Sequence, residues 1–422
     1  MTEMKTPLKV MAFGVGAFTH GILHVLKQNN ALVSTYLTRD YAHYSPSLEG
    51  ETYHSEVYPN PCTLLKQKEI DLVIPMSIDW MLKDWATELL AMEVPILSPI
   101  GEAMKLERDR DFAKRLGKQL GIPFPRSFVA RNRLEAENIL DAHARGYVIK
   151  NTLCSPTSPV HTILCETAED TRKWLEQVNY AEGIFMQEYM GRREVGHIAF
   201  VNNGEVISLV TNQEYKRAFN GNMGIVAGAP LGGLVEQDPG DKYGLAEHLL
   251  QPLLPWFRDV NFKGPVQVTA IMKNDQWYVL EYNVRLGITS GPMILQMLEN
   301  PLEVLWNVAC NRKVEIKFKP EMHYGCSLTL AGYGYPYVTV VGPHLPIQIT
   351  GDLTCGVWWN EVDIDNKGQL FMTGHRIADI IGLAPTLEQA ISIAYDNIRK
   401  IRCVGSYYRT DIGKSLWPPG SE

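Results

Sequence analysis

Residues 281–287 read Glu-Tyr-Asn-Val-Arg-Leu-Gly and carry the strongest local signal in the chain. They end a stretch with the pattern of a strand, and side chains two apart on a strand point to the same face. Glu281 and Asn283 therefore share a face, where both offer oxygen atoms to a hard cation such as Mg²⁺. Arg285 adds a planar cation for a carboxylate or a phosphate. A polar strand end with a solvated turn would explain the same residues, so this stretch alone leaves both interpretations open.

Four further groups match what an ATP site requires. Lys150 ends an apolar strand, from which it could hold phosphate oxygens. A second strand end could present its backbone to an adenine edge, and Glu194 could accept hydrogen bonds from ribose hydroxyls. Lys216 and Arg217 follow a strand and precede a glycine-bearing loop at 220–224. Each group taken singly is typical of a surface charge, and it is their joint order that favours a nucleotide site. The adenine segment consists of Gln187, Glu188, Tyr189 and Met190.

The composition is that of an ordinary globular protein. The chain has 422 residues, of which 45% are hydrophobic and 21% charged, which excludes disorder, collagen and coiled coil and suggests roughly three domains. Its 40 basic and 47 acidic residues give a net charge of −7, which argues against a nucleic-acid partner. No apolar stretch is long enough to predict a membrane-spanning helix, and the N-terminal residues do not have the pattern of a signal peptide. Seven scattered cysteines without a CxxC pair indicate a reduced, cytoplasmic protein.

The order of strands and helices predicts a mixed architecture. Strands alternating with helices over residues 1–100 predict an α/β domain with a doubly wound parallel sheet. A charged amphipathic helix is expected over 101–120. After it, antiparallel strands with segregated helices predict an α+β domain. The segment 322–422 has short strands, glycine-rich turns and one helix. Two hairpins are expected to turn at Asn202-Asn203-Gly204 and Lys273-Asn274-Asp275.

Several short motifs are individually weak but jointly specific. They are Leu106-Glu107 with Phe112-Ala113-Lys114 and Gly121-Ile122-Pro123, then residues 213–217 (Gln-Glu-Tyr-Lys-Arg), 281–287, 332–336 (Gly-Tyr-Gly-Tyr-Pro) and 408–413 (Tyr-Arg-Thr-Asp-Ile-Gly). Their order resembles the ATP-grasp superfamily and, more closely, the glycinamide ribonucleotide synthetases, also called phosphoribosylamine–glycine ligases. The resemblance runs nearly end to end. It implies an N-terminal pre-ATP-grasp domain at 1–100, a connecting helix at 101–125, an ATP-grasp small lobe at 126–192, a large lobe at 193–321 and a C-terminal α+β domain at 322–422.

The resemblance also implies a reaction and roles for the residues. ATP phosphorylates a carboxylate, an amine attacks the acyl phosphate to form an amide, and ADP and phosphate are released. Glu281 and Asn283 would hold Mg²⁺ or Mn²⁺. Arg285, Lys216 and Arg217 would be the catalytic residues. The nucleotide would be bound between the two lobes by Arg110, Lys150, Gln187, Glu188, Tyr189, Met190 and Glu194.

The chain departs from the family where the family recognises glycine and phosphoribosylamine. The first loop, 14–21, reads Gly-Val-Gly-Ala-Phe-Thr-His-Gly where the family has Gly-Gly-Arg-Glu-His, and Pro75-Met76-Ser77 stands where it has Gly-Pro-Glu. The family's glycine-rich flap corresponds to 151–160, which contains no glycine and no lysine. The loop after Arg285 also differs, because Ile288 to Pro292 replace the family's Asp-Pro-Glu-Thr-Gln. The expected substrate contacts are Thr19, His20, Ser77 and Arg376.

These departures make a ligase with an altered acid and amine the leading interpretation. A genuine phosphoribosylamine–glycine ligase of purine biosynthesis and a catalytically silent nucleotide- or metabolite-binding protein are the alternatives. The expected partners are a small-molecule carboxylate and amine, with no nucleic acid and no membrane, in a monomer or homodimer. His20 and His24 are spaced i, i+4 but lack the glutamate of a HExxH zinc motif, so a packed or solvated helix face is expected there.

Overall fold

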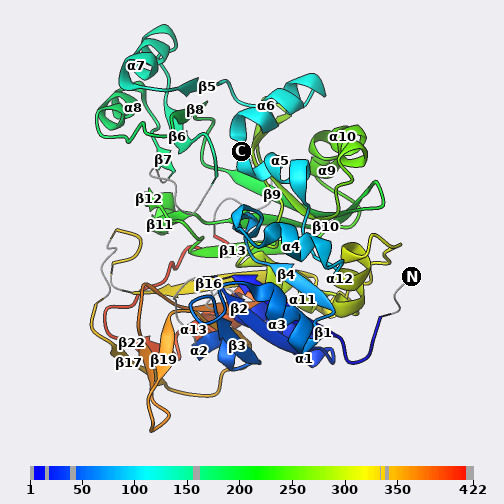
Figure 1. Cartoon of the computed structure of the whole chain (residues 1–422). Coiled ribbons are helices and arrows are strands. Elements are labelled where there is room, and N and C mark those ends of the chain that lie inside the picture. Colours follow the sequence, from blue (N-terminus) through cyan, green and yellow to red (C-terminus); the bar gives the residue numbers. More distant parts are fainter. Residues whose placement is uncertain are drawn as a thin grey trace.

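The computed structural model describes residues 4–14, 19–38, 44–154, 162–332, 334–337 and 342–414. Its N-terminal part is a parallel sheet in the order β3-β2-β1-β4, which confirms the predicted α/β architecture (Figure 1). A parallel bridge from Val73 to Ile96 extends this sheet. The strands are β1 (Lys9–Gly14), β2 (Leu32–Leu37), β3 (Glu51–His54) and β4 (Leu72–Pro75), and the helices are α1 (His20–Gln28), α2 (Tyr44–Ser47), α3 (Pro61–Lys68) and α4 (Ala86–Ala91).

An eight-stranded antiparallel sheet forms the centre of the molecule, in the order β15-β14-β9-β10-β13-β16-β21-β18. Three of its strands come from beyond residue 322, so the C-terminal segment continues the sheet of the expected large lobe. The strands are β9 (Glu194–Asn202), β10 (Glu205–Glu214), β13 (Gly232–Gln237), β14 (Gly264–Lys273), β15 (Gln276–Asn283), β16 (Tyr324–Ala331), β18 (Gly356–Trp359) and β21 (Arg376–Ala384).

Both expected hairpins turn where the sequence places them. Asn203 (φ 50°) and Gly204 (φ 72°) join β9 to β10, and Asn274 (φ 50°) and Asp275 (φ 56°) join β14 to β15. Two consecutive positive φ values suit the right-handed twist of the flanking strands, and asparagine, aspartate and glycine adopt them most readily. The second hairpin matters for the site, because β15 carries Glu281 and Asn283.

The small lobe is a separate antiparallel sheet in the order β5-β8-β6-β7, at the top of Figure 1. It has its own apolar cluster, which includes Ile149, Leu140 and Ile184. The elements are β5 (Ser127–Ala130), α7 (Arg133–Ala142), β6 (Tyr147–Asn151), β7 (Ile163–Leu164), α8 (Ala168–Leu175) and β8 (Ile184–Glu188).

The continuous helix predicted over 101–120 is wrong. The structure has a 3₁₀ turn (Gly101–Met104), α5 (Lys105–Arg108) and α6 (Arg110–Gln119), with Asp109 extended between the two α-helices. Asp109 Oδ1 accepts the Phe112 N–H at 2.9 Å, and its backbone pairs with Leu153. A short acidic side chain that caps a new helix favours a non-helical backbone at its own position. The break brings Arg110 to the end of β6.

Other helices and a smaller sheet surround the central sheet. The sheet has the order β19-β20-β17-β22, and a hairpin of β11 and β12 lies beside the small lobe. These elements are β11 (Arg217–Phe219), β12 (Met223–Val226), α9 (Leu245–Leu249), α10 (Leu254–Asp259), α11 (Ser290–Met297), α12 (Pro301–Ala309), β17 (Leu345–Ile349), β19 (Val362–Ile364), β20 (Leu370–Met372), α13 (Leu387–Ile398) and β22 (Ile401–Cys403).

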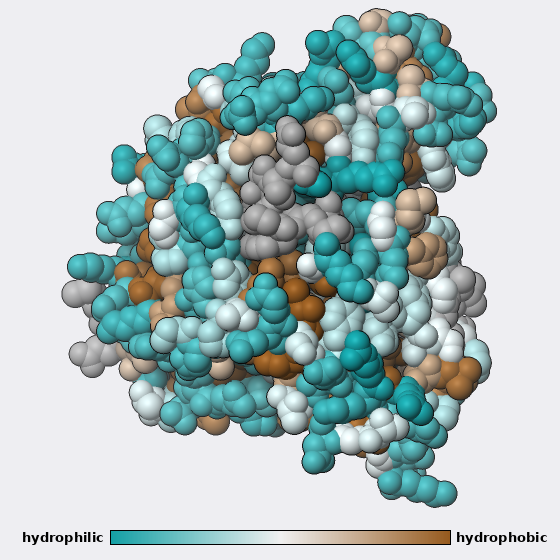
Figure 2. All heavy atoms as spheres, turned by 180° about the vertical axis from the view of Figure 1, so that it is seen from behind, coloured by the Kyte–Doolittle hydropathy of each residue, from teal (hydrophilic) through white to brown (hydrophobic). Residues whose placement is uncertain are grey.

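The apolar core crosses the boundaries between the parts. One buried cluster joins Phe13 and Tyr36 of the N-terminal sheet to Val266 and Val279 of the central sheet. The surface seen from behind is mostly hydrophilic, with one apolar area near its middle (Figure 2). Among the described residues, no helix has both the length and the apolar character needed to span a bilayer.

Candidate active site

A cavity of about 780 Å³ opens between the small lobe, the central sheet and the β11–β12 hairpin. This volume lies within the usual range of small-molecule sites. Every residue predicted for metal, nucleotide or catalysis lines it, and so does Arg376. The lining includes Arg110, Lys150, Gln187, Glu188, Tyr189, Met190, Glu194, Lys216, Arg217, Glu281, Asn283 and Arg285.

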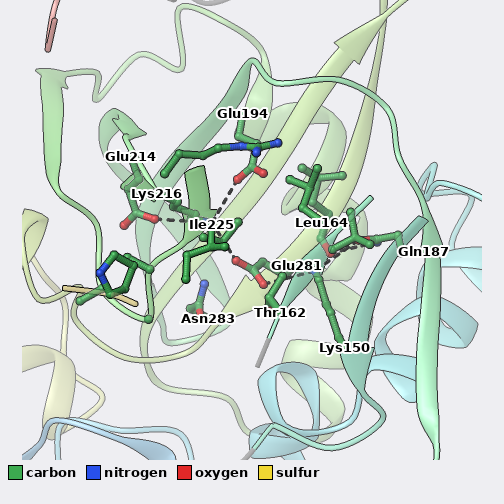
Figure 3. Close-up of a pocket in the computed structure, with 18 of the residues that line it drawn as sticks. Lys150, Thr162, Leu164, Gln187, Glu194, Glu214, Lys216, Ile225, Glu281 and Asn283 are labelled. Carbon is green, nitrogen blue, oxygen red and sulfur yellow. Dashed lines mark hydrogen bonds and ion pairs between the residues drawn. The ribbon is translucent and has the colours of Figure 1, made fainter. Parts of the chain in front are cut away.

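Glu281 and Asn283 lie at the C-terminal end of β15, where both line the cavity. They pair with Thr269 and Gln267 of β14, which fixes both on the same face. Figure 3 shows the two side chains beside one another, with the Glu281 carboxylate turned toward Lys150 and Lys216. One carboxylate and one amide oxygen make a donor set suited to Mg²⁺, which takes its remaining ligands from phosphates and water.

Lys216 lies among three glutamates. Its Nζ is 3.0 Å from Glu281 Oε1, 3.1 Å from Glu194 Oε2 and 3.7 Å from Glu214 Oε2 (Figure 3). Burial lowers the pKa of Lys216, but the three carboxylates outweigh it and hold that pKa well above the ordinary value of 10.5. Lys216 is therefore charged and is the counter-ion of the Glu281 carboxylate.

Lys150 approaches the same carboxylate from the small lobe. It is 5% exposed, and its Nζ lies 3.3 Å from Gln187 Oε1 and 3.6 Å from Glu281 Oε2. Burial lowers the pKa of Lys150. Lys216 first, and then Lys150 and Arg110, hold the pKa of Glu281 well below its ordinary value in spite of burial. Glu281 is thus a carboxylate at neutral pH, as a metal ligand must be.

Arg285 is held by Glu107, a residue for which no role is predicted from the sequence. Glu107 is 6% exposed; its Oε2 accepts the Val284 N–H at 2.6 Å and its Oε1 accepts the Arg285 Nε–H at 3.1 Å. This ion pair raises the pKa of Arg285. Arg285 Nη2 also lies 3.4 Å from Asn283 Oδ1. The Leu106-Glu107 motif was visible, but nothing in its spacing pairs it with a residue 178 positions away.

Two further glutamates belong to the cavity region. Glu214 ends β10 and lines the cavity, and burial raises its pKa. Its place two residues before Lys216 on a strand end was a usable signal, since such residues share a face. Glu166 of the small lobe accepts hydrogen bonds at 2.8 Å from both Arg192 and Arg217. Glu166 therefore ties the small lobe to the β11–β12 hairpin.

The expected adenine segment begins with the last two residues of β8, Gln187 and Glu188, and continues beyond its end. Gln187 is 2% exposed, and its Nε2 donates to the Leu280 carbonyl at 3.1 Å, which ties the small lobe to β15. Glu188, Tyr189 and Met190 continue along the cavity wall.

Three of the four expected substrate contacts lie outside this cavity. Ser77 Oγ accepts the Asp79 N–H at 3.3 Å and caps a 3₁₀ turn. Thr19 and His20 are buried at the start of α1. Arg376 does line the cavity, but its guanidinium also pairs with Asp379 at 2.9 Å. Residues 15–18 of the first loop and 155–160 of the flap lie outside the described residues.

His20, His24 and Glu49 form a cluster with the composition of a metal site, but the hydrogen bonds of His20 do not suit it as a metal ligand. The Trp359 N–H donates to His20 Nδ1 at 3.1 Å, so the ring proton is on Nε2, which donates to Glu49 Oε1 at 3.1 Å. His24 Nδ1 lies 2.9 Å from the same oxygen. A metal at His20 Nε2 would require a proton on Nδ1, facing the Trp359 N–H. Glu49 lies in the loop that follows α2, and its hydrogen bonds to both histidines clamp α1 to that loop.

Comparison with protein families finds two domains of one family in the chain. Residues 108–289 match the ATP-grasp (A) domain of phosphoribosylglycinamide synthetase, and residues 326–415 match its C domain. The first match contains the cavity residues from Arg110 to Arg285, and the second contains Arg376.

Relatives and solved structures extend this similarity over nearly the whole length. The chain is 24% identical to the phosphoribosylamine–glycine ligase of Clostridium acetobutylicum over 424 residues, which covers 97% of this chain and 100% of that protein. The crystal structure of the Thermotoga maritima phosphoribosylamine–glycine ligase superposes with a TM-score of 0.76 at 21% identity, over 96% of this chain and 100% of that one. The biotin carboxylase domain of Hydrogenobacter thermophilus 2-oxoglutarate carboxylase, a dimer in complex with MgADP, gives 0.69 at 12% identity, over 96% and 92%.

Proposed function

Because the chain belongs to the phosphoribosylglycinamide synthetase family of ATP-grasp ligases, we propose that its cavity joins a carboxylate to an amine at the expense of ATP, releasing ADP and phosphate. One observation carries this proposal. Two oxygen ligands, Glu281 and Asn283, and three cations, Lys150, Lys216 and Arg285, converge in a single cavity between lobes.

The described residues fit Mg²⁺ and ATP. The cations Arg110, Lys150 and Lys216 would face the phosphates, while residues 187–190 would meet the adenine and Glu194 the ribose. Glu281 and Asn283 would hold Mg²⁺, which offsets the charge of the transferred phosphoryl group when bound. Lys216, whose Nζ lies 3.0 Å from Glu281 and 3.1 Å from Glu194, would offer its charge to the phosphate oxygens.

The side chains would then act mainly by positioning. Arg285, fixed by Glu107, would orient the carboxylate so that one of its oxygens attacks the γ-phosphorus and the bond to ADP breaks. The amine nitrogen would attack the carbonyl carbon of the acyl phosphate, and phosphate would leave with the carbon–oxygen bond electrons. Holding the reactants in this geometry supplies most of the acceleration in such reactions.

Two substrate pairs are compatible with this ligase. Glycine with phosphoribosylamine is supported by relatives of that name that match along nearly the full chain. An altered pair is supported by the changed first loop and by Ser77 and His20, whose polar atoms are engaged within the protein. The first pair is supported at least as well as the second.

The test is ADP release over a panel of amino acids, each with and without phosphoribosylamine, with the Glu281→Gln variant as the control for background hydrolysis. Turnover with glycine and phosphoribosylamine would establish the first pair. Turnover only with other compounds would establish an altered pair. Stoichiometric AMP would contradict the ligase mechanism, and ADP binding without turnover on any pair would favour a binding protein.

A further inference from the structure

Arg409 is a buried cation that no step of the proposed reaction uses. It is 1% exposed, although its side chain is among the largest that the described core contains. A buried guanidinium is stable only when its donors are satisfied. Asp411 receives two of them, from Nε at 2.9 Å and from Nη2 at 2.7 Å. The guanidinium carbon also lies over the Tyr215 ring, 5.0 Å from its centroid.

The remaining donors of Arg409 point to the loop that carries two of the cavity cations. Nη1 donates to the Arg217 carbonyl at 3.0 Å and to Asn222 Oδ1 at 3.1 Å. Arg217 and Asn222 both line the cavity. Lys216 is the residue between them and Tyr215 in the sequence, so Arg409 contacts the residues on either side of it. Arg409 thus fixes both ends of the turn from residue 217 to residue 222.

The neighbours of Arg409 add contacts to the same turn. Asn220 donates to Thr410 Oγ1 at 2.7 Å and accepts the Thr410 N–H at 2.9 Å. The Gly221 N–H donates to Asp411 Oδ2 at 2.9 Å, and the Gly413 N–H to the Tyr215 hydroxyl at 3.1 Å. Residues 409–413 therefore form a strap over the turn, with contacts along its length.

On the outer side of the turn the Phe219 ring stacks on Tyr337, with centroids 5.6 Å apart, and meets Tyr407 at 6.0 Å, but much of the apolar surface there stays exposed. Phe219, Met223 and Ile225 are 46%, 56% and 41% exposed. A loop with such exposed side chains loses order easily, and ordering it when ligand binds would cost affinity. The contacts with residues 409–413 hold the turn in place before any ligand binds.

We propose that the strap of residues 409–413, centred on Arg409, is a positioning device that holds Lys216 and Arg217 ready for the phosphates of the nucleotide. The inference rests on the proposed function, because it takes the cavity to bind ATP. It assigns Arg409 no contact with substrate. Its distinctive consequence is selectivity: weakening the strap lowers affinity for the phosphate end of the nucleotide and leaves affinity for the adenine base unaffected, since residues 187–190 belong to another lobe.

Two variants and a matched control test this. Arg409→Lys keeps the charge but cannot make the forked pair with Asp411, and Asn220→Ala removes two hydrogen bonds at an exposed position that does not line the cavity. Arg172→Gln is the control, because Arg172 of α8 also pairs with an aspartate, Asp141, at 2.6 Å, but is exposed, does not line the cavity and has no contact with the strap. Calorimetric titration with MgADP and with adenine gives the two affinities, and circular dichroism checks the fold.

We expect the Kd for MgADP to rise roughly tenfold in Arg409→Lys and about threefold in Asn220→Ala, as lost hydrogen bonds of ordinary strength would produce. The Kd for adenine should stay unchanged in both, and Arg172→Gln should match the wild type. Unchanged MgADP affinity in the folded variants would overturn the inference, as would a parallel loss for both ligands. If Arg409→Lys does not fold, Asn220→Ala decides. A wild-type protein that binds neither ligand would instead refute the nucleotide site itself, and the strap's role with it.

Discussion

Glu281 forms ion pairs with two cations of the cavity, Lys216 and Lys150. Glu281→Gln keeps the shape of the side chain but removes the charge that would bind Mg²⁺. We expect kcat/KM for ADP release to fall at least about 100-fold, the scale on which loss of a charged group at a transferring phosphoryl is felt. Glu205→Gln, at an exposed glutamate of β10, should leave turnover unchanged. Normal turnover in a folded Glu281→Gln protein would contradict the metal assignment.

Glu107 acts on the reaction through Arg285. In Glu107→Gln an amide oxygen can still accept the Val284 N–H, but the charge that orients Arg285 is lost. We expect kcat to fall by about tenfold with little change in the KM for ATP, because a charge-assisted bond that places a reacting partner is weakened. Glu102→Gln removes an exposed ion pair from the same segment and serves as the control. A pure KM effect would show that Arg285 contacts ATP rather than the carboxylate.

The break between α5 and α6 is the feature of local structure with the clearest link to the site. Asp109→Ala removes the cap of α6 and should cost about 1 kcal/mol of unfolding free energy. Because the break places Arg110 at the end of β6, the KM for ATP should also rise severalfold. Asn132→Ala removes the cap of α7, where Oδ1 accepts the Glu135 N–H at the same 2.9 Å, and should cost a similar stability with KM unchanged. If the KM for ATP is the same in the two variants, the helix break makes no contribution to nucleotide binding. Urea unfolding and steady-state kinetics provide the measurements.

The clamp on α1 predicts a pH-dependent stability. The hydrogen bonds from His20 and His24 outweigh burial and hold the pKa of Glu49 below its ordinary 4.5, with Lys27 at 3.6 Å. The resulting stabilisation is complete above pH 4.5 and is lost as the pH falls through the lower pKa of the folded state. Glu49→Gln should therefore cost about 1–3 kcal/mol at pH 7 and progressively less in acid. Glu51→Gln, at an exposed glutamate, should have almost no effect. A difference that stays constant with pH would contradict the clamp.

Local rules predicted the elements that depend on neighbours in sequence. Glycine and asparagine marked the hairpins at residues 203–204, and the period of two placed Glu281 with Asn283. The helix break at Asp109 was missed because an aspartate in a helical pattern is ambiguous until its capping partner and the pairing with Leu153 are seen. Lys150, Glu188 and Glu281 were predictable because they lie near strand ends, whereas Arg110, which begins α6, was predicted only from the family resemblance. Glu107 was not predictable as a partner of Arg285, because only the folded chain brings residues so far apart together.

At the scale of the whole molecule, the central sheet makes the C-terminal segment indispensable. A chain ending at residue 321 would lack β16, β21 and β18 and leave β13 as an uncovered edge. Edges of that kind are prone to aggregate, and the apolar cluster around Leu328 and Ile380 would be lost. We expect this shortened chain to lack the near-ultraviolet circular dichroism and the urea transition of the full chain. A shortened chain that unfolds cooperatively would show that the residues before 322 fold alone.

The strap also determines when, during synthesis of the chain, the turn at residues 217–222 can become ordered. A ribosome delivers Arg217 long before Arg409, which lies 192 positions later. A nascent chain whose cavity residues have emerged up to Arg285 still lacks the contacts that residues 409–413 make with the turn at 217–222. Affinity for nucleotide should therefore arise late in translation rather than grow with chain length. This delay would spare a growing chain from closing on ATP before the rest of its sheet has been added.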